Sequence, residues 1–167
     1  MATHRVSIFG LSSPDSSGNV FYEPYSIKAT NDFWKHQIVV FNDSSTDDYL
    51  SGSFGVPKNY VGSAKWVIVW TSTATSGNAV WEQGYRTVAG DDANSLDQAT
   101  AEETQTVTDA APGAANRRLE VSITPTSANF AADETVEFKF GRKGTSGSDT
   151  MAAAAMLFDL FFEYADA

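Results

Sequence analysis

The stretch from Lys65 to Thr87 constrains the fold most, because it holds two aromatic-rich segments on either side of a polar turn. The first segment alternates so that both faces of the expected strand are largely apolar, with Trp66, Ile68 and Trp70 on one face and Val67, Val69 and Thr71 on the other. Thr-Ser-Gly-Asn then tolerates turn conformations, and Ala79–Val88 follows as the second strand of an expected hairpin. A strand that is apolar on both faces needs cover on both sides. It therefore belongs inside a sandwich or at an interface between subunits.

Short strand-like runs alternate with turn-rich gaps along the rest of the chain. We expect about nine or ten strands spaced roughly 10–15 residues apart, which is typical of an antiparallel sandwich. One short helix is expected at Ser95–Glu103, and strands are expected at Arg5–Phe9, Asn19–Lys28, Phe33–Phe41, Tyr49–Gly55, the Trp66 segment, Ala79–Val88, Thr104–Thr108, Arg117–Thr124, Thr135–Gly141 and Met151–Tyr164. The sequence predicts an all-β, jelly-roll-like antiparallel β-sandwich, with an immunoglobulin-like sandwich as the alternative topology.

The C-terminal segment Met151–Tyr164 could form a helix or a strand. Its alanine run favours helix, but alternation with a period of two and abundant aromatic residues favour strand. A regular strand would place Met156, Phe158, Leu160, Phe162 and Tyr164 on one face and Leu157, Asp159, Phe161 and Glu163 on the other. The clearest half-buried strand is Arg117–Thr124, with Leu119, Val121 and Ile123 inward and Arg118, Glu120 and Ser122 outward.

The N-terminal residues have a weaker core pattern than the rest of the chain. We therefore expect a single domain in two parts: an N-terminal strand or arm at residues 1–28, and the sandwich at residues 29–167. An arm of this kind would gain order against a partner, so it is the expected attachment segment.

The composition excludes several classes of function. Eleven basic against twenty-one acidic residues give a formal net charge of −10, which repels bare nucleic acid and anionic membranes. The absence of cysteine excludes disulfides, thiolate nucleophiles and cysteine-ligated metals. The apolar C-terminal segment is interrupted by acidic residues and is shorter than the roughly twenty residues that a membrane-spanning helix needs. We expect neither a nucleic-acid nor a membrane partner.

The residue pattern predicts no catalytic, cofactor or metal site. His4 and His36 lack neighbouring ligands at metal-binding spacing, and no nucleophile motif accompanies them. The acidic loops lack the ordered spacing of a calcium loop. Glu102-Glu103 and Asp133-Glu134 could resemble a glycosidase pair, but so could any two of the twenty-one acidic residues, so they are not a specific signal. The expected core and interface packing residues are Trp66, Trp70, Phe158, Leu160, Phe162 and Tyr164, and the possible exposed binding aromatics are Trp34 and Trp81.

The second half of the chain resembles small virion proteins of tailed bacteriophages and modules appended to their tail and fibre proteins. The matching elements are KWVIVWTSTATSGNAVWEQGYR, SLDQAT, TVTDAAPGAANRRLEVSITPTSANFAADETVEFKFGRKG and SDTMAAAAMLFDLFFEYADA. The resemblance implies a β-sandwich on the virion surface, commonly trimeric, and it supplies no catalytic motif.

We therefore expect a virion structural protein without enzymatic activity, and we favour a capsid decoration (cement) protein that stabilises the head by non-covalent contacts. It would be assembled in the host cytoplasm and lie on the capsid surface. Its partners would be the major capsid protein or another virion protein, and further copies of itself in a homotrimer. The alternative is a tail-tip or fibre-associated module that binds a receptor or a carbohydrate through exposed aromatic side chains.

Overall fold

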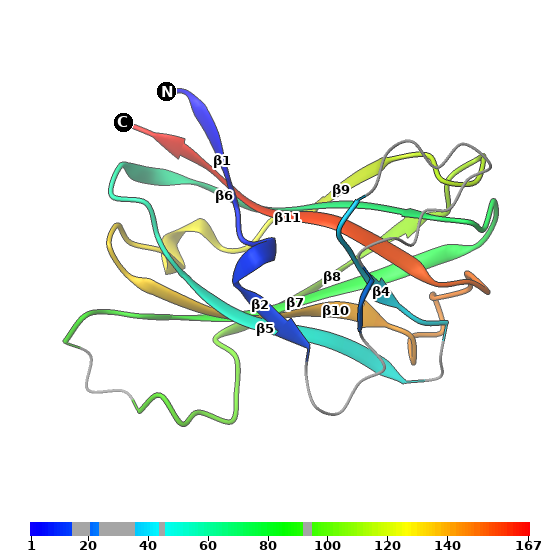
Figure 1. Ribbon diagram of the computed structural model, residues 1–167. Helices are drawn as coiled ribbons and strands as arrows, with labels where there is room; N and C mark the ends of the chain where they lie inside the picture. The colour runs from blue at the N-terminus through cyan, green and yellow to red at the C-terminus, as the bar shows by residue number, and fades with distance from the viewer. Residues whose placement is uncertain (15–20, 24–35, 44–45, 92–94) are drawn as a thin grey trace.

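The computed structural model describes residues 1–14, 21–23, 36–43, 46–91 and 95–167, which form two stacked β-sheets (Figure 1). The six-stranded sheet has the order β3-β4-β11-β6-β9, with β1 also paired to β11, and the five-stranded sheet has the order β2-β5-β10-β7-β8. All of these strand pairs are antiparallel. The predicted all-β, jelly-roll-like antiparallel sandwich is confirmed.

The chain moves repeatedly from one sheet to the other. The six-stranded sheet consists of β1 (Thr3–Ser7), β3 (Phe21–Glu23), β4 (Ile38–Phe41), β6 (Tyr60–Ser72), β9 (Leu119–Ile123) and β11 (Ala155–Asp166). The five-stranded sheet consists of β2 (Ser12–Pro14), β5 (Asp47–Gly55), β7 (Asn78–Val88), β8 (Glu103–Ala110) and β10 (Thr135–Lys143). Two 3-10 turns, η1 (Phe9–Leu11) and η2 (Ser127–Asn129), complete the elements.

The short helix expected at Ser95–Glu103 is wrong. Residues 95–102 are irregular chain that leads into β8. This polar, acidic stretch offers no apolar face to bury, and most helical stability in proteins comes from packing such a face. No helix among the described residues is long and apolar enough to span a membrane.

The hairpin expected at Lys65–Thr87 is also wrong, because β6 and β7 lie in different sheets. β6 pairs with β11 and β9, whereas β7 pairs with β10 and β8. The polar connection therefore crosses the edge of the sandwich instead of joining two paired strands. Gly77 makes the crossing possible: its φ is +88°, and a Cβ there would lie 2.6 Å from the carbonyl oxygen of Thr150.

The crossing brings tryptophans of the two strands into contact in the core. Trp66, Trp70 and Trp81 have no exposed surface, and the rings of Trp70 and Trp81 lie 5.4 Å apart in an edge-to-face contact. Phe140 stacks on Trp81 at 5.4 Å. The prediction of Trp81 as an exposed binding aromatic is therefore wrong, because its position on β7 points between the sheets. Trp34 lies outside the described residues.

A β-bulge changes the predicted faces of the C-terminal strand. β11 is a strand, as predicted, but its pairing with β6 shifts register between Leu157 and Asp159, so that Phe158 is an extra residue. Leu157 joins Leu160, Phe162 and Tyr164 in the main core. Simple alternation predicts Phe158 on the same face as Leu160. Instead, Phe158 packs with Met156 in a separate cluster that also contains Ile38, Val40 and Ala154.

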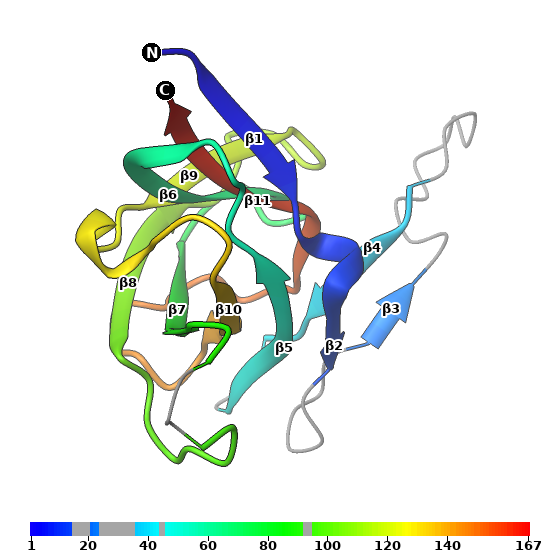
Figure 2. The ribbon, with the colours of Figure 1, turned by 90° about the vertical axis from the view of Figure 1, so that its left-hand side faces the viewer.

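The N-terminal segment belongs to both sheets where the structure describes it. β1 pairs with β11 from Thr3↔Ala165 to Ser7↔Phe161, so the two chain ends lie side by side (Figures 1 and 2). β2 pairs with β5, and β3 pairs with β4. The boundary predicted after residue 28 therefore does not separate these three strands from the sandwich. The attachment role of the segment stays a prediction.

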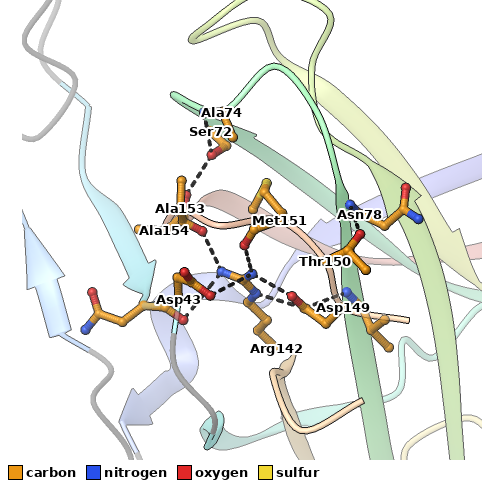
Figure 3. Close-up of polar contacts among 12 residues, drawn as sticks. Asp43, Ser72, Ala74, Asn78, Arg142, Asp149, Thr150, Met151, Ala153 and Ala154 are labelled. Carbon is orange, nitrogen blue, oxygen red and sulfur yellow. Dashed lines mark hydrogen bonds and ion pairs between the residues drawn. The ribbon is translucent and has the colours of Figure 1, made fainter. Parts of the chain in front are cut away.

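A buried arginine fixes the connection between β10 and β11 (Figure 3). The Arg142 side chain is 1% exposed, and its Nε and Nη2 donate to the two carboxylate oxygens of Asp149 at 2.9 and 2.6 Å. Nη2 and Nη1 also donate to the carbonyl oxygens of Met151 (2.6 Å) and Ala153 (2.7 Å). The glycine-rich loop after Lys143 is thus anchored by several charge-assisted hydrogen bonds.

Candidate functional site

The outer face of the six-stranded sheet, which is the face turned away from the core, carries an open groove of about 470 Å³. We call it the main groove. Its described lining residues come from β6, from the turn before β9, from β11 and from the residues before β4: His36, Val69, Asn116, Arg118, Phe158, Asp159 and Phe161. These residues are far apart in the sequence and are brought together by the strand order β4-β11-β6-β9.

The floor of the main groove is apolar and partly aromatic. Phe161 faces outward because Leu160 and Phe162 on either side of it face the core. Phe158 faces the same way because of the bulge, and the His36 ring contacts it edge to face at 5.1 Å. The floor therefore offers two half-buried phenyl rings and an exposed imidazole.

The rim of the main groove is polar. Asn116 has a φ of +63°, in the left-handed region that asparagine tolerates, and its backbone N–H donates to the Ser72 carbonyl at 2.9 Å. The Oδ1 of Asp159 accepts from the Ser7 hydroxyl at 2.6 Å and from the Leu160 N–H at 2.9 Å. Within the described part of the chain, the Asn116 side-chain amide and the Asp159 Oδ2 have no hydrogen-bond partner. Both remain able to bind a ligand.

A second groove of about 440 Å³ lies next to the first on the same face, and we call it the charged groove. Arg5 on β1 donates through Nε to Glu163 at 2.7 Å and through Nη2 to Glu120 at 2.8 Å. Since β11 and β6 lie between β1 and β9, the Arg5–Glu120 ion pair crosses both strands. The two grooves meet where Phe161 of the main groove pairs with Val67 of the charged groove.

The carboxylates of the charged groove are held in their ionised form. Hydrogen bonds from Arg5 and then Arg118 lower the pKa of Glu120 below its ordinary value. Burial alone would raise the pKa of Glu163, but hydrogen bonds from Arg5 and Lys65 together lower it. The guanidinium and ammonium groups on this face are therefore already matched by ionised carboxylates.

The outer face of the five-stranded sheet has a smaller hollow of about 140 Å³ beside Tyr49. The Tyr49 hydroxyl donates to Glu82 at 2.5 Å, and the Lys139 ammonium lies 4.2 Å from the centre of the ring. Burial and then the hydrogen bond to Glu82 raise the pKa of Tyr49. A cation thus covers one face of this ring, so less of the ring is available to stack on a ligand than in the phenyl rings of the main groove.

The structure places the predicted packing residues on two sides of the six-stranded sheet. Phe158 contributes to the main groove. The other five are buried between the sheets: Trp66, Trp70, Leu160, Phe162 and Tyr164. Their role in a trimer stays a prediction. Among the described residues, no three histidine, aspartate or glutamate side chains gather as metal ligands.

The sequence reasoning missed most of the groove. The alternation predicts that Arg118 faces outward, and its side chain does line the main groove, although Arg118 lies just before β9 and not within it. Asn116 ends the Pro112–Asn116 turn, and the composition of that turn is the only local signal for it. Phe161 and Asp159 were assigned to the face opposite Phe158, and the bulge brings all three onto one face.

No protein-family model and no curated protein sequence matches the chain. Solved structures do resemble it. A family 35 carbohydrate-binding module from Clostridium thermocellum has a TM-score of 0.57 at 12% identity, with 99% of each chain covered. A CBM35 from Paenibacillus barcinonensis gives 0.54 at 12% identity, covering 99% of this chain and 100% of that one. The C-terminal CBM6 of LamC from Zobellia galactanivorans gives 0.50 at 12% identity, covering 98% and 100%.

These neighbours correct the family expected from the sequence. The resemblance to bacteriophage virion proteins is wrong, because the structural neighbours are carbohydrate-binding modules of families 35 and 6. At 12% identity the likeness shows the fold, a β-sandwich of the kind found in these modules.

Proposed function

We propose that this chain is a non-catalytic carbohydrate-binding module and that the main groove is its binding site. The single observation that carries the proposal is the combination of two outward phenyl rings with polar groups that keep unused hydrogen-bonding capacity on one open face. The structural neighbours, whose names describe carbohydrate-binding modules, support it. The groove volume lies within the ~300–1,000 Å³ range of ligand sites.

Each part of the groove matches a part of a sugar. A pyranose ring has a face of C–H groups, which would pack on Phe158 and Phe161, and a rim of hydroxyls that need hydrogen-bond partners. The Asn116 amide can donate to one hydroxyl and accept from another, and Asp159 can accept through Oδ2. Because Ser7 and the Leu160 N–H hold Oδ1 in place, the Asp159 carboxylate is oriented before a ligand arrives.

The groove is not arranged for glycoside hydrolysis. Most glycosidases flank the scissile bond with two carboxyl groups about 5–10 Å apart. Among the described residues that line the main groove, Asp159 is the only carboxylate. The open shape also leaves a bound sugar in contact with water, so we expect dissociation constants of roughly 0.1–1 mM, equivalent to about 4–5.5 kcal/mol.

The test is affinity electrophoresis against a panel of soluble polysaccharides, followed by calorimetry with oligosaccharides of any polymer that retards the protein. Asn116→Gly removes the amide and keeps a residue suited to positive φ, so it should weaken binding about tenfold. Asp133→Gly is the matched control, because Asp133 is an exposed residue with a φ of +67° that lies outside the main groove.

Phe161→Ala should abolish retardation by removing part of the floor. Circular dichroism and thermal melts would show that each variant is folded. If the wild-type protein binds no polysaccharide in the panel, or if the Asn116 and Asp133 variants bind equally well, the proposed function or the proposed site is wrong.

A further inference from the structure

The charges around the main groove cancel one another. Among its described lining residues, Arg118 is the only arginine or lysine and Asp159 the only carboxylate. The Nη2 of Arg118 donates to the Oε2 of Glu120 at 2.7 Å, so this guanidinium is already neutralised at the edge of the groove. An anionic ligand entering here would meet a matched cation and an unmatched carboxylate.

Glu120 is the residue that produces this balance. Its two oxygens accept from two different guanidinium groups, Oε1 from Arg5 and Oε2 from Arg118. Arg5 is matched a second time by Glu163, which also binds Lys65 at 3.3 Å. The cations of both grooves are therefore engaged by carboxylates of the same sheet face.

Recognition of a uronate or sulfate group normally uses an arginine whose forked N–H groups are available for a bidentate contact. Here Glu120 occupies part of each fork, and an anion would have to displace it. The net charge of −10 adds a long-range repulsion for polyanions.

We propose that Glu120 is a specificity-determining residue that restricts the main groove to uncharged sugars. This inference rests on the proposed carbohydrate-binding function and adds the ligand class: neutral glycans are accepted, and glycans rich in uronate or sulfate groups are rejected. Glu120 acts through Arg5 and Arg118 and need not contact the sugar itself.

The experiment compares neutral polymers (xylan, galactan and glucomannan) with anionic polymers (polygalacturonate and alginate) by affinity electrophoresis and calorimetry at low and moderate salt. The wild-type protein should bind at least one neutral polymer and bind the anionic polymers at least tenfold more weakly. Glu120→Gln removes the carboxylate that pairs with Arg118, whereas Arg5 keeps its ion pair with Glu163. The variant should raise affinity for the anionic polymers about fivefold, which corresponds to about 1 kcal/mol for an exposed charge pair. The gain should shrink as salt is added.

Two controls separate local charge from total charge. Asp97→Asn changes the net charge by the same amount on an exposed loop outside both grooves, and it should leave the ratio of anionic to neutral binding unchanged. Adding Arg118→Gln to the Glu120→Gln variant should remove most of the gain, because the released Arg118 is the cation nearest the ligand.

The outcomes distinguish this inference from the proposed function. A wild-type protein that binds polygalacturonate or alginate as tightly as neutral polymers overturns the inference and leaves the carbohydrate-binding function standing. Equal gains in the Glu120 and Asp97 variants also overturn it, since total charge would then be the cause. A protein that binds no polymer of either class overturns both.

Discussion

Replacement of Arg142 by methionine should destabilise the fold strongly. Methionine keeps much of the aliphatic stem but removes the guanidinium, which bridges Asp149 and two loop carbonyls. Asp149 is 3% exposed, so its carboxylate would be left buried without a counter-charge, although the Val80 N–H still donates to it at 3.0 Å. The carbonyl oxygens of Met151 and Ala153 would lose a charged donor at the same time.

Removing one partner of a buried ion pair typically costs about 3–5 kcal/mol. In a protein of this size each kcal/mol lowers the melting temperature by roughly 2–4 °C, so we expect a decrease of about 6–20 °C. Asp149→Asn, which removes the charge but keeps the shape, should cost less. The double variant should cost less than the sum of the two single variants, because the unmatched charge is absent from it.

Urea unfolding followed by circular dichroism and tryptophan emission measures these free energies. Arg117→Met is the matched control, because Arg117 is exposed, and its change should stay within about 0.5 kcal/mol. If Arg142→Met loses less than about 1 kcal/mol while Asp149 remains ionised, the ion pair does not anchor the β10–β11 connection and the reasoning is refuted.

Two further predictions concern the edges of the sandwich. Gly77→Ala should cost at least about 2 kcal/mol, because alanine disfavours a φ of +88° and its Cβ would collide with backbone atoms of the β10–β11 connection; thermal melts measure the loss. Glu163 and Glu120 have lowered pKa values, so they stabilise the fold fully above the ordinary glutamate pKa of about 4.3, and that stability is lost as the pH falls below it. Thermal melts from pH 7 to pH 3 should show this loss as a falling melting temperature. In the Glu163→Gln variant the melting temperature should fall less steeply over the same pH range. A variant with the same pH profile as the wild-type protein would contradict the assignment.

Local alternation was sufficient to predict most of the strands and the fold class, but not the short strand β2. In β9 the inward Leu119 and Ile123 and the outward Glu120 follow the period of two without interruption, and the structure agrees. The same logic located β6 and β10. Each of these strands has one largely apolar face, and burial of that face against a second sheet determines its orientation.

Pairing partners could not be predicted in the same way. The polar turn after Trp70 has the composition of a hairpin turn, but the apolar inner faces of β6 and β7 are buried against each other across the sandwich. A hairpin and a crossing between sheets use the same turn residues, so composition alone cannot separate them. Trp81 was misplaced for this reason, since its exposure depends on which sheet β7 joins.

The proposed binding face depends on the β-bulge in β11, which the alternation of residues in the sequence does not reveal. Because Phe158 is the extra residue of the bulge, Leu157 and Leu160 both reach the core while Phe158 and Asp159 both face outward. A regular strand cannot place neighbouring residues on one face. The bulge therefore sets an aromatic ring beside a hydrogen-bond acceptor on one strand, and the neighbouring Phe161 completes the floor. In the proposed function a sugar uses both kinds of contact within the width of one ring, and this irregularity in β11 places the two groups side by side without interrupting the core beneath.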